Sequence, residues 1–276
     1  MSSRTSSRPV GRKYKFASLL WRLVPFVGYH HVLMILQASS IILLSVLLAG
    51  CSSYSSMTNV YILGLSYTNS TPSGMSDIGR NLSDTLNGYK GNSQLEVRTG
   101  YFGLCIRQRG IVWLCSSDSN ALAQQIGAEN DPLNLIGAAS KFRDDVLFSG
   151  LLFMALVLAF LCILFLATFP NWHEMPNGST GSLVDVKPFP SRAVSQVALT
   201  VSSVAAVLLL IAGLWQHVGS VGAAAMAEMA NYGNIETDVG TVAVTMAWAG
   251  FTLTAIVSMG LLVLILSIKA LDRLTG

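Results

Sequence analysis

Two cysteines in the first long polar segment are the residues of this chain best placed for covalent chemistry. Between Cys105 and Cys115 lies segment 107–110, Arg-Gln-Arg-Gly, which is suited to a hairpin turn. Such a turn would place the two sulfurs on neighbouring strands, within the separation that a disulfide needs. In an oxidising compartment we therefore expect Cys105 and Cys115 to be bonded to each other.

The remaining cysteines predict no bridge. Cys162 lies inside an apolar run, where a cysteine acts as a small apolar residue. Cys51 follows the first apolar run, and we expect a free thiol at the membrane surface. Residues 47–51, Leu-Leu-Ala-Gly-Cys, also resemble the lipobox at which a bacterial signal peptide is cut and its cysteine acylated. Three further apolar runs and a long leading segment favour an uncleaved chain.

Acidic residues outside the apolar runs offer the hard oxygen ligands that calcium prefers. None follows the spacing of a dedicated calcium loop, so we expect a solvated acidic surface, with calcium as a permeant or weakly bound ion and no cofactor. The residues that could attract calcium are Asp118, Glu129, Asp131, Asp144, Asp145, Glu228, Glu236 and Asp238.

No residue pattern indicates an enzyme. The sequence contains no nucleophile–base pair, no metal-ligand spacing and no glycine loop suited to phosphate. His30 and His31 are adjacent, but neither His173 nor His217 completes a ligand spacing with them, so we expect interfacial side chains. We therefore assign no catalytic residue and no metal ligand.

Four long apolar runs must position these side chains. Residues 32–50, 147–169, 193–218 and 242–268 contain no Asp, Glu, Lys or Arg. Each run approaches or exceeds the ~20 residues with which a helix crosses a ~30 Å hydrocarbon core. The chain is 52% hydrophobic and only 11% charged, whereas about a quarter of the residues of a soluble domain are charged. The sequence predicts a bundle of four transmembrane helices.

The basic residues orient this bundle. Segment 1–31 carries six Lys or Arg and no acidic residue, whereas segment 51–146 balances seven basic against eight acidic residues. An excess of Lys and Arg favours the cytosolic side of a membrane. We therefore expect both termini in the cytosol and the two loops 51–146 and 219–241 outside the cell.

This topology predicts the following domain organisation. The segments are a cytosolic basic N-terminus with an interfacial helix at 13–27 (1–31), transmembrane helix one (32–50), an extracellular loop domain (51–146), transmembrane helix two (147–169), a cytosolic loop (170–192), transmembrane helix three (193–218), a short extracellular loop (219–241), transmembrane helix four (242–268) and a cytosolic tail (269–276).

The extracellular loop domain is long enough to fold on its own elements. Residues 54–67, 95–101 and 106–114 are rich in β-branched and aromatic residues, so we expect a small antiparallel sheet. Asp131 and Pro132 resemble a helix start, and we expect that helix to run unbroken into the second span.

Sequons for N-glycosylation begin at Asn69, Asn81 and Asn177. Only the first two fall in the predicted extracellular loop, so Asn69 and Asn81 are the glycosylation candidates. The third lies in the predicted cytosolic loop, where sugar is not added.

The spans lack the usual mark of an ion path. A conduction path through the bundle would ordinarily carry ionisable residues inside the spans. The polar candidates are Gln37, Gln196, Gln216 and His217, and the last two lie near an outer helix end. We therefore expect any pore to lie between subunits.

The topology and the cysteine pair resemble the claudin superfamily of four-helix membrane proteins. Within it, the segment from Gly100 to Cys115 resembles the signature of the fungal calcium regulator and membrane fusion protein family, also called factor-induced gene one. The motif residues are Gly100, Tyr101, Phe102, Gly103, Cys105 and Cys115. Animal claudins place a Trp directly after the Gly-Leu pair, where this chain has Cys105, so the tight-junction branch does not fit.

The resemblance implies a fungal plasma-membrane protein that promotes low-affinity calcium influx and membrane fusion during mating or cell fusion. It implies contact with the lipid bilayer, with further copies of the chain as a homo-oligomer, and with partner membrane proteins or a calcium channel. Nucleic acid has no place in this function. The alternative is a non-conducting membrane organiser or adhesion protein of the PalI or eisosome four-span type.

Overall fold

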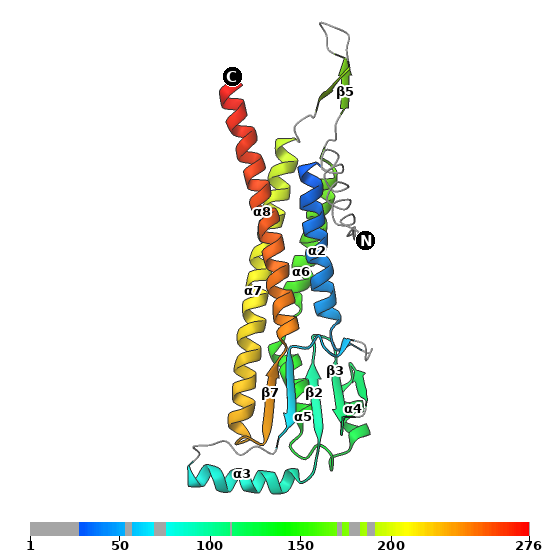
Figure 1. Ribbon diagram of the computed structural model, residues 1–276, viewed down its shortest axis with the longest axis vertical. Coiled ribbons are helices and arrows are strands. Elements are labelled where there is room, and N and C mark those ends of the chain that lie inside the picture. Colours follow the sequence, from blue (N-terminus) through cyan, green and yellow to red (C-terminus); the bar gives the residue numbers. More distant parts are fainter. Residues whose placement is uncertain are drawn as a thin grey trace, which may run out of the picture.

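The computed structural model describes residues 28–52, 57–68, 76–110, 112–169, 173–176, 183–186 and 191–275 (Figure 1). The interfacial helix expected at 13–27 and the sequons at Asn69 and Asn177 lie outside the described residues. Asn81 is described and exposed.

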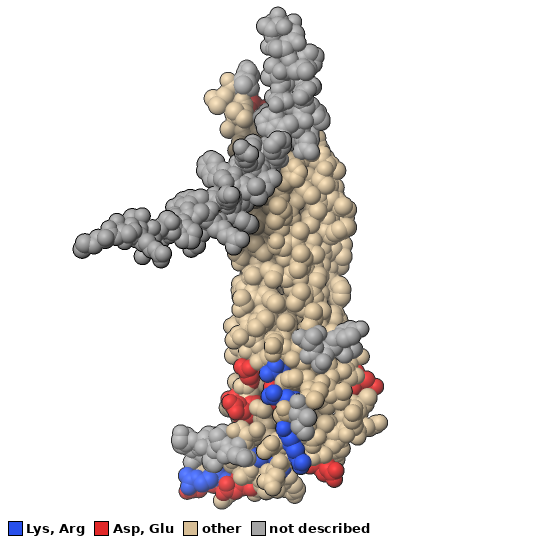
Figure 2. Space-filling model, turned by 45° about the vertical axis from the view of Figure 1, so that its right-hand side comes forward, with Lys and Arg blue, Asp and Glu red and all other residues tan. Residues whose placement is uncertain are grey.

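Among the residues that the structure describes, four helices have the length and the apolar composition to cross a membrane, as predicted. They are α2 (Tyr29–Ala49), α6 (Gly150–Ala167), α7 (Arg192–Ala230) and α8 (Thr241–Thr275). Figure 2 shows a broad belt over the bundle without charged side chains, below which Lys, Arg, Asp and Glu gather on the sheet domain. The chain is therefore a multi-pass membrane protein.

The four helices form one bundle in which α2 and α7 each pack against both α6 and α8. Small and hydroxyl-bearing residues allow close approach: Ser40 Oγ on α2 donates a hydrogen bond to Gly250 O on α8 at 2.9 Å. The Oγ atoms of Ser203 on α7 and Ser258 on α8 are 2.7 Å apart. In lipid, where apolar burial does not drive association, such contacts hold helices together.

An antiparallel sheet covers one end of the bundle (Figure 1). Its five strands lie in the order β4-β3-β2-β1-β7. The strands are β1 (Leu63–Tyr67), β2 (Leu95–Thr99), β3 (Leu104–Gln108), β4 (Trp113–Ser116) and β7 (Ile235–Val239). Helices α3 (Asp77–Lys90), α4 (Ser119–Ile126) and α5 (Leu135–Lys141) complete the domain, and β5 (His173–Pro176) pairs with β6 (Leu183–Val186) in the connection between α6 and α7.

Segment 219–241 does more than connect two spans. Its first residues continue α7 to Ala230, and residues 235–239 form β7, which pairs with β1. The 39 residues of α7 span about 58 Å at 1.5 Å per residue, well beyond a ~30 Å hydrocarbon core. Both loops expected outside the cell therefore build one sheet.

The expectation of one unbroken helix from Asp131 into the second span is wrong. The helix starts at Leu135, after Asn134 in the left-handed conformation, and Asp131 caps it by accepting hydrogen bonds from Leu135 N and Ile136 N. A π-helical turn (Phe142–Val146) follows, and Leu147 is extended, so α6 begins only at Gly150. Trp215 Nε1 on α7 donates to the exposed Val146 O at 2.8 Å, which stabilises this break.

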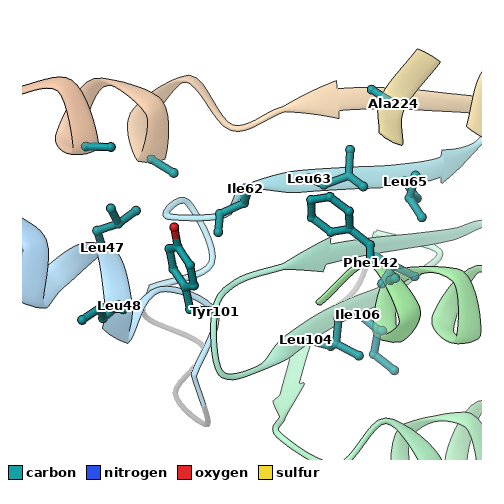
Figure 3. Packing of buried hydrophobic residues seen from close by; sticks show 14 of the residues in the cluster. Leu47, Leu48, Ile62, Leu63, Leu65, Tyr101, Leu104, Ile106, Phe142 and Ala224 are labelled. Atoms are coloured by element: carbon teal, nitrogen blue, oxygen red, sulfur yellow. The ribbon is translucent and has the colours of Figure 1, made fainter. Parts of the chain in front are cut away.

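One hydrophobic cluster joins the sheet to the bundle (Figure 3). Leu63 and Leu104 from the sheet share it with Leu47 of α2, Leu152 of α6 and Phe142 of the π-helical turn. Full burial of each such side chain contributes ~1.5–3 kcal/mol. Because the core is continuous, we expect the sheet and the outer half of the bundle to unfold together.

Candidate functional site

The motif segment forms the turn between β2 and β3, where the sheet meets the end of α2. Gly100 N donates a hydrogen bond to Gly103 O at 2.9 Å, which closes the turn. A Cβ on Gly100 would lie 2.1 Å from Gly50 O, and a Cβ on Gly103 would lie 2.1 Å from Cys51 O. No side chain fits at either position, so the glycines are required by the close approach of the turn to the end of α2.

Tyr101 projects from this turn into the bundle (Figure 3). Its side chain is 7% exposed, and its hydroxyl donates a hydrogen bond to Gln216 Oε1 on α7 at 3.0 Å. Burial raises the pKa of the Tyr101 hydroxyl, so the neutral donor is the form present. Gln216, expected near an outer helix end, is in fact 2% exposed and links α7 to the motif. The motif therefore connects the sheet to two helices.

Phe102, the next residue of the motif, lies on the outside of the junction. It is 41% exposed, and its ring centroid is 5.8 Å from that of Phe153 on α6, which is 48% exposed. Exposed aromatic rings at the end of a membrane-crossing bundle are typical of the lipid–water interface. From this we infer that the pair lies near the level at which the bundle leaves the bilayer.

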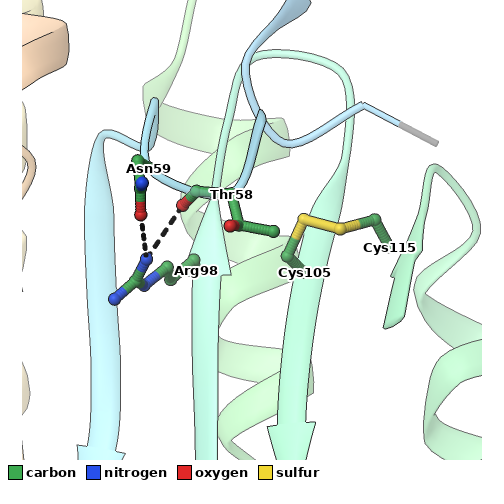
Figure 4. Close-up of a disulfide and its surroundings, with 5 residues drawn as sticks. All are labelled: Thr58, Asn59, Arg98, Cys105 and Cys115. Carbon is green, nitrogen blue, oxygen red and sulfur yellow. Dashed lines mark hydrogen bonds between the residues drawn. A yellow bond between two sulfur atoms is a disulfide. The ribbon is translucent and has the colours of Figure 1, made fainter. Parts of the chain in front are cut away.

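Cys105 and Cys115 form a disulfide, as predicted (Figure 4). They face each other directly in the register of β3 and β4, with their Cα atoms 4.0 Å apart. Cys105 is fully buried. The bridge therefore holds the edge strand β4 to the strand that begins at the motif turn.

A stacked cluster of side chains on β2, β3 and β4 and on Tyr61, just before β1, was not predicted. The guanidinium carbon of Arg98 lies 4.5 Å from the ring centroid of Tyr61 and 4.4 Å from that of Trp113. Arg107 lies 4.8 Å from Trp113 and pairs with Glu96, which also pairs with Arg98. Cation–π contacts of this kind stabilise by about 0.5–2 kcal/mol each.

Arg98 also fixes the segment that follows α2. Its Nη1 donates hydrogen bonds to Thr58 O at 3.0 Å and to Asn59 Oδ1 at 3.3 Å (Figure 4). The alternation of apolar Leu95 and Val97 with charged Glu96 and Arg98 is the one sequence signal that places Arg98 on the face opposite the core.

Most of the acidic residues considered for calcium have structural partners. Asp118 caps α4, Asp131 caps α5, and Glu228 accepts hydrogen bonds from Thr237. Asp238 accepts one from the Tyr61 hydroxyl. The bond from the Arg143 side chain holds the pKa of Asp144 below its usual range. Glu129, Asp145 and Glu236 are exposed.

The structure does not bring these acidic residues together. Within the described ranges, no three His, Cys, Asp or Glu side chains are grouped so that they could hold a metal ion. Seven of the eight carboxylates are exposed, all but Asp131, and Glu129, Asp145 and Glu236 lie at separate places in the chain. The arrangement can attract cations to a surface but offers no described site that would bind calcium tightly.

Inside the bundle, buried polar side chains separate two apolar clusters. We call Gln37, Ser40, Ser202 and Thr254 the polar layer; all are fully buried. On α2, α7 and α8 these residues fall between those of the cluster shared with the sheet and those of a second cluster. Ser40 and Thr254 share a hydrogen bond of 3.0 Å, whereas the Gln37 amide has no hydrogen-bond partner among the described residues.

Cys51 is free, as expected, but it is fully buried beneath the motif turn. Burial raises the pKa of its thiol to about 12, against a smaller lowering by Arg98. The folded state favours the protonated thiol. Its contribution to the free energy of unfolding is therefore complete below the ordinary thiol pKa and is lost as the pH rises toward the raised pKa of the folded state.

We therefore expect Cys51 in the native protein to resist alkylation by maleimide at pH 8 and to react fully after unfolding. Maleimide reacts with the thiolate. The raised pKa of Cys51 lowers the fraction of thiolate, and burial keeps the reagent from the sulfur. Mass spectrometry of the peptide that contains Cys51 measures the label. Labelling before unfolding, or an acylated Cys51 at a new N-terminus, would contradict this prediction.

Fold and site together define a four-span membrane protein with a disulfide-linked sheet fixed to the bundle by a glycine-aromatic-glycine turn. The chain belongs to the family described as the Ca2+ regulator and membrane fusion protein Fig1, whose model matches residues 82–267. That range runs from α3 into α8 and includes the motif, the disulfide and three of the four spans. A search of curated proteins found no match.

Proposed function

We propose that this chain is a fungal plasma-membrane protein, claudin-like in architecture, that promotes calcium influx and membrane fusion during mating or cell fusion. The observation that carries the proposal is membership of a family described by calcium regulation and membrane fusion. In this topology the sheet faces the cell exterior and both termini face the cytosol. The basic N-terminal segment supports this orientation.

The packing of the bundle argues for an ion route outside the single chain. Apolar side chains fill the bundle on both sides of the polar layer. A hydrated path through one bundle would have to cross both clusters, at the cost of removing an ion from water. We place the route between copies of the chain or in a partner channel, with calcium as the permeant ion.

A second candidate is a non-conducting organiser or adhesion protein. The specific observation in its favour is the same filled bundle, together with a rigid sheet domain that can present a fixed surface. In this case the chain would act by contact with neighbouring proteins or with an opposed membrane. It would leave the calcium permeability of a cell unchanged.

The test is calcium entry into liposomes that carry only the purified full chain, with the sheet domain facing outward. We expect entry above that of protein-free liposomes. We expect it to fall by about twofold or more in the variant Glu129→Gln/Glu236→Gln, because exposed carboxylates raise the local cation concentration. Both residues are exposed, so the substitutions leave the fold intact.

The matched control is Asp77→Asn/Asp84→Asn, which removes two exposed carboxylates of α3 that are not among the calcium candidates. It should leave entry near that of the unchanged chain. Entry in cells but none in liposomes would assign the flux to a partner channel. No entry in either system, with cell contact or fusion retained, would establish the organiser.

A further inference from the structure

Helix α3 exposes three of its four large apolar residues, while Leu86 is half-buried and polar residues are buried. Ile78 and Tyr89 are 81% and 74% exposed, and Leu82 is 40% exposed. The residues that α3 buries are Gly79, Ser83 and Lys90. A surface helix of a globular domain ordinarily does the opposite and turns its apolar stripe toward the core.

The exposed apolar residues form one stripe. At 3.6 residues per turn, Ile78, Leu82 and Tyr89 lie within about 40° of one another around the helix axis. We call these three residues the α3 stripe. Single exposed apolar side chains are common on protein surfaces, but a row along one helix face indicates a binding surface.

Hydrogen bonds fix the polar face of α3 to the domain and so leave the stripe outside. Ser83 Oγ donates to Tyr232 O at 2.9 Å, and Asn234 Nδ2 donates to Ser83 O at 3.0 Å. Lys90 Nζ donates to Thr68 O near the end of the helix. These contacts tie α3 to the segment between α7 and β7 and to the residue that follows β1, so the helix cannot roll to bury the stripe without breaking them.

The position of α3 tells which surface the stripe can meet. The helix crosses the end of the sheet domain farthest from the bundle and runs across the long axis of the molecule (Figure 1). Strand β2 connects the region of α3 to the motif turn at the end of α2, and its five residues span about 17 Å. The stripe therefore lies well outside the bilayer that holds the bundle.

We propose that the α3 stripe binds the outer leaflet of an opposed bilayer. A helix that lies across the bundle axis is parallel to a membrane facing the domain, and an amphipathic helix in that plane buries its apolar face ~5–10 Å into the headgroup region. The inference rests on the proposed function, because fusion brings a second membrane to this end of the molecule.

The charges of α3 select the lipid. The exposed charges of α3 are those of Asp77, Asp84 and Arg80, because Lys90 is buried. They sum to −1, so anionic lipid would not attract the helix. The stripe fits a zwitterionic surface such as phosphatidylcholine, and we expect its binding to be insensitive to salt.

The test is capture of protein-free phosphatidylcholine vesicles by the native full chain held in nanodiscs, measured by co-flotation in calcium-free buffer. We expect capture by the unchanged chain and about a tenfold or greater loss in Ile78→Gln/Tyr89→Gln, since two apolar side chains no longer enter the leaflet. Both residues are exposed and Gln is a good helix former, so the variant should fold, which its disulfide and thermal midpoint check.

The matched control is Val112→Gln, which removes an apolar side chain that is 70% exposed on the sheet domain but is not part of α3. Equal capture by the unchanged chain and the double variant, or equal loss in the control, would overturn the proposal. So would capture that requires the chain in both membranes. Lipid-only capture without calcium needs neither flux nor fusion, so its failure is distinct from failure of the proposed function.

The sequon at Asn81 allows one more variant to be tested in the same vesicle-capture experiment. Asn81 is exposed on the same helix, about 60° from Ile78. Capture by Asn81→Gln should equal or exceed that of the native protein. Capture by Asn81→Gln alone would show that sugar covers the stripe in the native protein and would overturn the proposal.

Discussion

Gly100→Ala is expected to keep the sheet domain from packing onto the bundle and to leave little folded protein. The new Cβ would lie 2.1 Å from Gly50 O and 2.9 Å from the Cβ of Cys51. Neither neighbour is the flexible end of a side chain, so the backbone of the turn or of the end of α2 must move. Such overpacking costs about 3 kcal/mol or more, a large part of the stability of a typical domain.

The measurement is the yield of monodisperse full chain and its thermal midpoint in detergent. Gly103→Ala should behave in the same way, because its Cβ would lie 2.1 Å from Cys51 O. The control is Gly88→Ala in α3, where no atom lies within 4 Å of the added Cβ and alanine favours the helix by ~1 kcal/mol. A Gly100→Ala protein as stable as the Gly88→Ala protein would contradict the close approach described here.

The spans and the disulfide could be predicted because their signals are local. A membrane-crossing helix must be continuously apolar over its length, so hydropathy alone locates α2, α6, α7 and α8. The cysteine pair lies on either side of a turn-forming segment, and adjacent strands joined by a short turn bring such residues together. Neither inference depends on the conformation of the rest of the chain.

The break before α6 and the strand β7 could not be predicted, because residues distant in the chain decide the local structure there. Position 147 is a leucine, so no Pro or Gly there indicates the break between the π-helical turn and α6. The carbonyl oxygen of Val146 accepts its hydrogen bond from Trp215, which lies on another helix. Strand β7 is short and contains Glu236 and Asp238, which weaken its strand propensity. Pairing with β1 overrides that preference, and such pairing is invisible to a reading of residues 219–241 alone.

For the candidate site, the sequence identified the residues of the motif but not what they contact. Two glycines around an aromatic pair suggest a tight turn, yet nothing local shows that the turn lies against Gly50 and Cys51. Gln216 is a polar residue within an apolar run, which suggests a buried partner, but that partner, Tyr101, is far away in the chain. These contacts of the motif can be identified only from the packing of the sheet on the bundle.

Removing the disulfide is expected to destabilise the full chain by about 2–4 kcal/mol and to reduce its delivery to the cell surface severalfold. The double variant Cys105→Ala/Cys115→Ala is preferred to serine, because Cys105 is fully buried and a serine hydroxyl there would add its own penalty. Without the bridge, the short edge strand β4 is held by its pairing with β3 and by the stacking of Arg98 and Arg107 on Trp113.

Surface labelling and the thermal midpoint in detergent measure the effect of the lost bridge. Cys162→Ala is the control for loss of a buried thiol as such, since Cys162 forms no disulfide. Reduction of the unchanged chain with dithiothreitol should lower the midpoint to that of the double variant, whereas the double variant should not respond. Normal surface delivery with reduced calcium entry would show that the hairpin of β3 and β4 takes part directly in function. Normal delivery with normal entry would show that the covalent bond is dispensable.

The expected result is a loss of delivery in proportion to the loss of stability. It follows if the bridge acts by holding the edge of the sheet, which the motif turn fixes to the bundle.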